Sequence, residues 1–145
     1  MDIVSVKPTI LAIAGGIGIF LGGLLGGWDI ALQTLIIFMM LDYVTGLVVA
    51  GVFKSSNKSM TGALDSRAGF KGLCRKGMML GIILVATQLD KMSGTNLVRS
   101  AVVYAFIVNE SVSIIENAGL MGIPIPDTLR KAIELLRKRE APQGE

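Results

Sequence analysis

Residues 97–125 read LVRSAVVYAFIVNESVSIIENAGLMGIPI, an apolar run that carries two glutamates in its second half. Acids are rare at membrane depth because they are costly to bury in hydrocarbon. When the run is placed on a helix at about 100° per residue, its polar side chains fall within about 120° of one another. They are Asn109, Glu110, Ser113, Glu116 and Asn117. A membrane helix with one polar stripe must turn that stripe towards something other than lipid.

Three further apolar runs precede this one. The first, residues 8–28, holds no charged residue, and at about 1.5 Å per residue its 21 positions extend roughly 30 Å, one hydrocarbon thickness. A cleaved secretory signal is the alternative for this run, but its apolar core is long and leads almost directly into the second run. The four spans are expected at about residues 9–27, 29–53, 72–90 and 99–122.

The composition excludes several classes of protein. Hydrophobic residues make up 52% of the 145 residues and charged residues only 17%, which indicates one integral membrane domain. Histidine is absent and there is one cysteine, so imidazole chemistry, an intramolecular disulfide and a cysteine-rich metal site are excluded. No catalytic, nucleotide-binding or nucleic-acid-binding motif is present. We therefore expect no enzyme activity, no cofactor, no metal and no nucleic-acid partner.

The distribution of basic residues predicts the orientation of the spans. With four spans, 12 of the 14 Lys and Arg residues would lie on one side of the membrane and the other two on the opposite side. This asymmetry predicts that both termini are cytoplasmic. A three-span arrangement, with the first run on the surface or the fourth run re-entrant, remains the alternative, although it would lose this separation of charge.

Two polar segments lie outside the expected spans. Residues 54–71 are rich in Ser, Asn, Gly and Lys and are expected to form a cytoplasmic loop, with a short surface helix near residues 61–67. Residues 126–140 are expected to form a basic amphipathic helix, because apolar residues recur at helical spacing at Leu129, Ala132, Ile133 and Leu136. Such a helix can lie on anionic lipid, for which a solvated tail is the equal alternative, and the basic loop is also expected to contact anionic lipid.

The first run contains small residues at intervals of four, namely Ala14, Gly18, Gly22 and Gly26. Repeated small residues at this spacing allow two membrane helices to approach closely. The glycines therefore predict helix packing, either between copies of the chain in a homo-oligomer or against the chain's own second run. Gly46 and Ala50 would provide the partner surface in the second case.

The intramembrane acids are the sharper signal for function. Asp42, Glu110 and Glu116 would each cost roughly 2.5–3.5 kcal/mol if they faced lipid at the centre of a span. They must be protonated, paired or exposed to water, and for Asp42 pairing with a neighbouring span and lining a pore are equal alternatives. Asp90 is expected to be an interfacial helix cap. We expect the polar stripe to be buried between helices at rest and to line a water-filled lesion after assembly.

Four blocks of sequence carry a resemblance to a known family. They are LDYVTGL (residues 41–47), SRAGFKGLCRK (66–76), LDKM (89–92) and NESVSIIENAGLMGIPIPDTL (109–129), of which the last is the most specific. Over about residues 28–136 the chain resembles phage holins of the toxin-secretion/phage-lysis family, which includes a clostridial toxin-release holin. The glycine-rich first run matches none of the family's motifs.

The resemblance implies an all-α bundle of about four transmembrane helices with a C-terminal amphipathic helix. It also implies a holin, a protein that accumulates and oligomerises in the bacterial cytoplasmic membrane. The lesions that it forms would release an endolysin or a toxin and time host lysis, without any catalytic residue. A small transporter or channel subunit, or a membrane adaptor that docks partners through the basic loop and tail, are the alternatives.

Overall fold

The computed structural model describes residues 3–58 and 60–140, and that part of the chain is helical without strands. Its helices are α1 (Ile3–Leu24), α2 (Ile30–Val48), α3 (Ser66–Ser93), α4 (Leu97–Leu120) and α5 (Asp127–Glu140), and a π-helical turn, η1 (Val49–Phe53), continues α2. The helices α1 to α4 are long and apolar enough to cross a membrane. The expected all-α fold, with four candidate spans and a shorter C-terminal helix, is confirmed.

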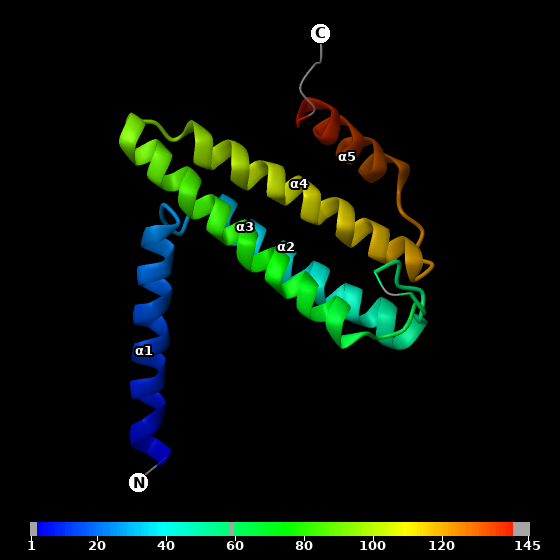
Figure 1. The fold of residues 1–145 in the computed structure, drawn as a ribbon, viewed down its shortest axis with the longest axis horizontal. Coiled ribbons are helices and arrows are strands. Elements are labelled where there is room, and N and C mark those ends of the chain that lie inside the picture. The colour runs from blue at the N-terminus through cyan, green and yellow to red at the C-terminus, as the bar shows by residue number, and fades with distance from the viewer. Residues whose placement is uncertain (1–2, 59, 141–145) are drawn as a thin grey trace.

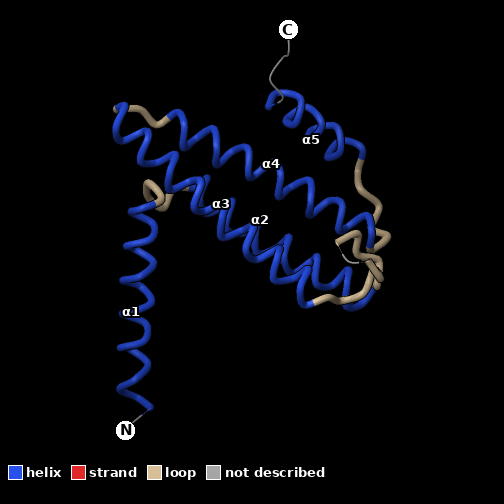
Figure 2. The backbone as a smooth tube through the Cα atoms, in the orientation of Figure 1, coloured by secondary structure: helices blue, strands red, loops and turns tan. Residues whose placement is uncertain are grey.

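The centre of the molecule is a bundle of α2, α3 and α4, in which α2 and α4 run in the same direction and α3 runs back between their ends (Figures 1 and 2). Apolar side chains at helical spacing fill its core, because residues three and four apart share one face of a helix. They are Leu32, Leu35 and Met39 of α2, Met79 and Ile83 of α3, and Val103 of α4.

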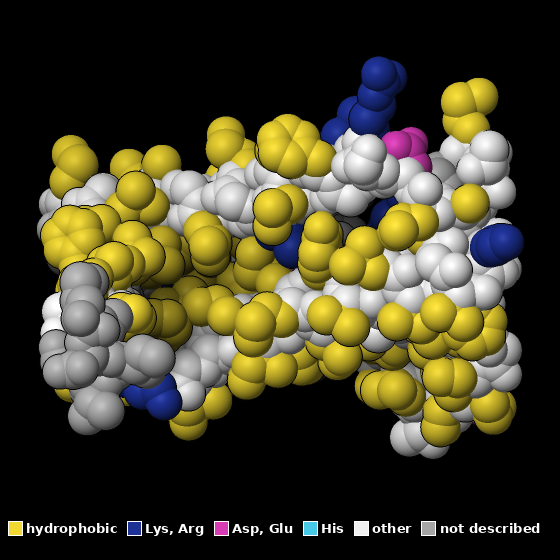
Figure 3. Space-filling model, turned by 90° about the horizontal axis from the view of Figure 1, so that it is seen from below, with side chains coloured by type: hydrophobic (Ala, Val, Ile, Leu, Met, Phe, Trp, Pro, Cys, Tyr) yellow, Lys and Arg dark blue, Asp and Glu magenta, His cyan; other side chains and the backbone are white. Residues whose placement is uncertain are grey.

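The outside of the bundle is also apolar. Large hydrophobic side chains such as Ile37, Met78 and Val85 are more than half exposed. Figure 3 shows hydrophobic side chains over most of one face, with only a few charged side chains among them. An exposed apolar surface of this extent suits a lipid surrounding, because in water it would drive association.

The connection between α2 and α3 is shorter than the expected loop 54–71, because α3 begins at Ser66. The Asp65 carboxylate accepts a hydrogen bond from the backbone N–H of Arg67 at 2.8 Å and so caps the first turn. The expected short helix at residues 61–67 is wrong, since residues 61–65 are turn and coil. The early start of α3 places Lys76 well inside a helix.

Helix α1 stands apart from the bundle and, within the described residues, does not pack along another helix (Figure 1). Packing of the first run against Gly46 and Ala50 is therefore not observed. Side chains built at Gly15, Gly16 and Gly18 would meet open space.

The glycine spacing extends beyond the helix, which ends at Leu24. Gly26 follows in a turn with φ +88°, a conformation that favours glycine. A side chain at Gly22 would collide with the indole of Trp28, which also donates a hydrogen bond to the Gly18 carbonyl at 2.8 Å. Of the three predicted packing glycines, Gly18 alone offers an unoccupied helical surface.

The C-terminal helix α5 begins after Pro126 and folds back beside α4 (Figure 1). Ile125 and the half-buried Ile133 border a small hollow of about 320 Å³ against Val112 and Ile115 of α4. Leu129, which was expected on the apolar face, is 45% exposed. The side chain of Leu136 lies outside the described residues.

Candidate functional site

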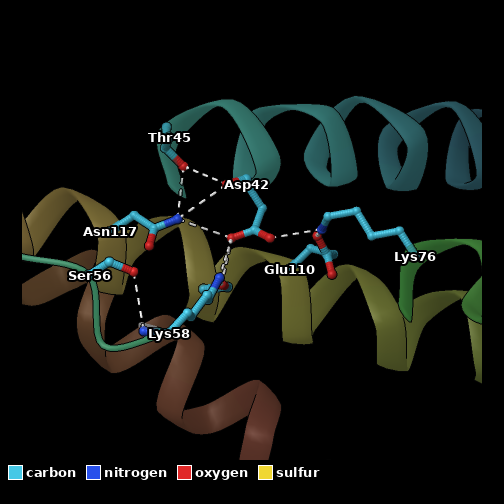
Figure 4. A network of polar contacts seen from close by, with 8 residues as sticks. Asp42, Thr45, Ser56, Lys58, Lys76, Glu110 and Asn117 are labelled. Carbon is cyan, nitrogen blue, oxygen red and sulfur yellow. Dashed lines mark hydrogen bonds and ion pairs between the residues drawn. The ribbon is translucent and has the colours of Figure 1, made fainter. Parts of the chain in front are cut away.

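Three charged residues from three helices meet inside the bundle. The ammonium of Lys76 on α3 lies 2.8 Å from a carboxylate oxygen of Asp42 on α2 and also pairs with Glu110 on α4 (Figure 4). Asp42 and Glu110 are only 6% and 3% exposed. We call these three residues the central cluster. Its charges are paired, as buried charges must be.

Two further residues of the predicted stripe join the central cluster through Asp42. The Ser113 hydroxyl donates a hydrogen bond to the Asp42 carboxylate at 2.5 Å. The Asn117 amide donates to the same carboxylate at 3.1 Å and to the Thr45 hydroxyl at 2.9 Å (Figure 4). Glu110, Ser113 and Asn117 lie at i, i+3 and i+7, so one face of α4 meets α2 and α3.

The other two stripe residues do not join this cluster. Asn109 and Glu116 are exposed, and Glu116 makes no ion pair among the residues that the structure describes. Both sit at the edge of the stripe, where the helix surface turns away from α2. The stripe that the sequence predicts is therefore divided into a buried part and an exposed part.

A second lysine approaches from the loop between α2 and α3. The Lys58 ammonium lies 3.8 Å from the Asp42 carboxylate and 3.5 Å from the Ser113 hydroxyl, and its side chain is half exposed. Sequence analysis missed both lysines as partners of the acids. The signal for Lys76 is its position ten residues inside α3, which becomes visible once Asp65 is recognised as the cap.

The central cluster lies near the middle of all three helices. At about 1.5 Å per residue, Asp42, Lys76 and Glu110 each fall within roughly 5 Å of the midpoint of their own helical segment. A hollow of about 570 Å³ adjoins the cluster and continues towards the loop end of the bundle, where Lys71 and Glu116 border it. We call it the polar hollow. Beyond the cluster, the apolar core closes the other half of the bundle.

A second set of charges lies at the opposite end of the bundle, around Arg99 on α4. Its guanidinium donates to the carbonyls of Leu25 and Gly27 at 2.6 and 3.2 Å, and to the Asp29 carboxylate at 2.6 Å. We call this set the end cluster. A side chain at Gly26 would lie 2.5 Å from the Arg99 guanidinium, so this turn needs glycine for space as well as for its backbone conformation.

Acids complete the end cluster. The Arg99 hydrogen bond lowers the pKa of Asp29 below its usual value. Asp29 also caps α2 by accepting a hydrogen bond from the backbone N–H of Leu32 at 2.8 Å. Asp90 lies inside α3 and accepts hydrogen bonds from the backbone N–H groups of Val98 and Arg99, so it caps the first turn of α4 from the preceding helix.

The described residues contain no group of three acids or cysteines that could hold a metal ion. The acids of both clusters are instead paired with lysine or arginine. The arrangement can hold helices together, or expose a polar helix face when the helices separate.

The sequence pattern of the bacteriophage holin family matches residues 19–138. The chain belongs to the bacteriophage holin family. The match includes α2, α3 and α4, so both the central cluster and the end cluster lie inside it. It begins within α1, at the last part of the glycine-rich helix.

Relatives of this holin-family chain occur in bacteria and in a phage. An uncharacterized 14.9 kDa protein in the nagH 3′ region of Clostridium perfringens is 38% identical over 117 residues, which are 79% of this chain and 83% of the relative. An uncharacterized protein of Listeria monocytogenes is 35% identical over 119 residues, 81% of this chain and 79% of the relative. A probable holin of Bacillus phage phi105 is 28% identical over 106 residues, 72% and 73% of the two chains. No solved structure is detectably similar to the chain.

These findings confirm the family expected from the four sequence blocks. The protein is a non-enzymatic, multi-pass membrane protein with a holin-like function.

Proposed function

We propose that this chain accumulates and oligomerises in the bacterial cytoplasmic membrane and forms lesions that release an endolysin or a toxin and time host lysis. Both termini lie on the cytoplasmic side in this proposal, together with the loop between α2 and α3. The excess of Lys and Arg in that loop and in α5 supports this orientation. The probable holin among the relatives supports the activity.

The observation that carries the proposal is the bridge made by Lys76 between Asp42 and Glu110. In the single chain these charges are turned inward and paired, while the outer surface is apolar. In our proposal this arrangement is the closed state, which lipid can surround. An unpaired acid at the membrane centre costs roughly 2.5–3.5 kcal/mol, so the bridge stabilises this state.

Lesion formation requires the helices of the bundle to separate. Separation of α3 from α4 would remove Lys76 from Glu110 and open the buried face that carries Ser113 and Asn117. In an assembly of many chains, this face can line water instead of contacting α2 and α3. One polar face then serves as a helix contact in the closed state and as a wall in the lesion.

The exposed small-residue surface of α1 is proposed as a contact between chains. Gly18→Leu tests this proposal better than Gly22→Leu, because a side chain at Gly22 would also displace Trp28. Cross-linking in membranes should show fewer oligomers for Gly18→Leu than for the wild type. An unchanged ladder of cross-linked oligomers would exclude this surface as the contact.

The two glutamates of α4 provide a matched test of the lesion proposal. Glu110→Gln changes the central cluster, whereas Glu116→Gln removes the same charge from an exposed position. Each variant is induced in bacteria that also express an endolysin, and membrane potential and lysis are followed over time. We expect Glu110→Gln to delay lysis, because two acids no longer compete for one lysine, and Glu116→Gln to lyse with nearly wild-type timing.

Equal timing in the two variants and the wild type would contradict the role of the central cluster. The same experiment separates the alternative functions. A transporter would give solute flux without passage of the endolysin, and an adaptor would leave the membrane potential intact.

A further inference from the structure

The outer part of the polar hollow carries basic groups that the central cluster does not use. Lys71 and Arg75 border the hollow from α3, and neither makes an ion pair among the residues that the structure describes. The acids deeper in the hollow are already matched by Lys76 and Lys58. Glu116 is the remaining acid on its border, so the outer part has an excess of positive charge.

The spacing of these two bases suits a single phosphate group. Lys71 and Arg75 are four residues apart on one helix, so their Cβ atoms lie about 6 Å apart on the same face. Ammonium and guanidinium groups at such a distance can contact one phosphate together.

Small residues line the hollow beside the two bases. Ala68 and Gly72 line it, and a side chain built at Gly72 would meet nothing within 4 Å. A ligand can therefore approach the backbone of α3 here. The whole polar hollow, of which this is the outer part, has a volume of about 570 Å³, within the range of roughly 300–1,000 Å³ that small-molecule sites occupy.

The depth of the site points to a lipid. The midpoint of α3 lies between residues 79 and 80, so Lys71 is about 13 Å from it, close to the edge of a hydrocarbon core of about 30 Å. Arg75 is deeper, and its long side chain can extend to the same level. On the same helix, Leu73 and Met78 are more than half exposed, as expected beside acyl chains.

We propose that the outer part of the polar hollow binds the phosphate of an anionic phospholipid between Lys71 and Arg75, with Gly72 leaving room for the headgroup. This site deepens the proposed function, because it rests on the closed bundle lying in the membrane. It would place a lipid of the inner leaflet against the helix that carries Lys76.

The experiment measures lipid bound to the purified full-length protein in detergent by native mass spectrometry. The probes are phosphatidylglycerol, phosphatidylcholine and inorganic phosphate. We expect phosphatidylglycerol to bind at least five-fold more tightly than phosphatidylcholine. Lys71→Gln with Arg75→Gln should reduce phosphatidylglycerol binding at least five-fold, and Gly72→Leu should reduce it similarly without changing charge.

The control is Lys54→Gln with Arg67→Gln, which removes two exposed basic groups at the same end of the molecule but outside the hollow. It should bind phosphatidylglycerol within two-fold of the wild type. An equal loss in the control, no loss in Gly72→Leu, or equal binding of the two lipids would overturn the site. Displacement of the lipid by millimolar inorganic phosphate would also overturn it, since the site would then be one for free anions.

Lipid binding and lysis are measured in separate experiments, so that failure of one proposal can be distinguished from failure of the other. Variants that lose the lipid but lyse normally would support the site and leave the lesion proposal intact. Normal lipid binding by a Glu110→Gln variant with unaltered lysis would count against the lesion role of the central cluster and not against the lipid site.

Discussion

The central cluster and the end cluster each hold a buried base against acids, but they differ in what the base contacts. Arg99 donates to two backbone carbonyls and to one carboxylate that caps a helix. Lys76 contacts two carboxylates on the side chains of two helices. The partners of Arg99 are fixed by the turn, whereas the partners of Lys76 move whenever α2 and α4 move relative to α3.

This difference predicts different roles for the two clusters, one in the stability of the fold and the other in the change from the closed bundle to the open one. The planar guanidinium of Arg99 closes the end of the bundle, where the turn between α1 and α2 meets the start of α4. The ammonium of Lys76 adjoins the polar hollow, so water can replace the carboxylates as its partner. We expect the end cluster to affect how much protein folds and the central cluster to affect when the membrane opens.

The largest effect is expected for Lys76→Met, which leaves Glu110 buried without a counter-ion and Asp42 with only the half-exposed Lys58 at 3.8 Å. Removing one partner of a buried ion pair costs about 3–5 kcal/mol. Because this cost falls on the closed bundle, the variant should unfold more readily in denaturant titrations in detergent and should lyse cells earlier than the wild type.

The matched control for Lys76→Met carries Asp42→Asn and Glu110→Gln in addition. It removes all three charges while keeping side chains of similar size, so most of the lost stability should return. If the triple variant were as unstable as Lys76→Met, the pairing of charges would not be what stabilises the closed bundle.

Arg99→Met is expected to have the next largest effect, about 3 kcal/mol, at the low end of the range because Asp29 is half exposed. The thermal midpoint in detergent should fall and less protein should accumulate. Lysis time, compared at equal amounts of membrane protein, should match the wild type. A shift in lysis time as large as that of Lys76→Met would remove the distinction between the two clusters.

A smaller effect is expected for Ser113→Ala, which deletes the hydrogen bond to the Asp42 carboxylate. Hydrogen bonds to charged groups contribute about 1.5–3 kcal/mol, and about 1.5 is expected here because Lys76 and Asn117 still contact Asp42. Ser111→Ala is the control, because among the described residues its hydroxyl bonds to the Ile107 carbonyl of its own helix. Equal unfolding free energies for the two variants would remove Ser113 from the cluster.

The smallest effect concerns Asp29 and appears only in acid. Because its pKa is lowered in the folded protein, its contribution to stability is present above the pKa of the unfolded chain, about 3.9, and is lost as the pH falls through the lower folded pKa. Asp29→Asn keeps the helix cap but removes this contribution. The difference in thermal midpoint between wild type and variant should therefore shrink between pH 5 and pH 2. A difference that stays constant over this range would contradict the contribution of the lowered Asp29 pKa to stability.

The sequence predicts much of the fold, because the length of an apolar run that spans a membrane is set by the thickness of the bilayer. It also predicts that Glu110, Ser113 and Asn117 share a face, since helical periodicity is a local property. It does not predict which neighbouring helix meets that face, because the axial register between helices depends on packing. The sequence indicates Asp42 as a possible partner, but hydropathy alone starts the third span at residue 72, six residues after α3 begins, and so leaves Lys76 near the end of a span instead of inside it.

Arg99 and Gly26 show the same limit at the other end. A count of loop charges assigns Arg99 to the connection between the third and fourth spans, although its guanidinium is bound by carbonyls of a distant turn. The glycine spacing includes Gly26, although the helix has already ended and this residue is held in a left-handed turn. In both cases, the role of the residue depends on a tertiary contact that a local sequence pattern does not predict.

The position of Lys76 in the middle of α3 has a consequence for biogenesis. A lysine at the centre of a helix adds roughly 2.5–3.5 kcal/mol to the free energy of inserting that helix alone. Helix α2, with Asp42, precedes α3 in the chain and reaches the translocation machinery first. The acid is thus available when the lysine arrives, so Lys76 can pair with Asp42 as α3 enters the bilayer. The order of the helices in the chain therefore sets the order in which the charges are neutralised.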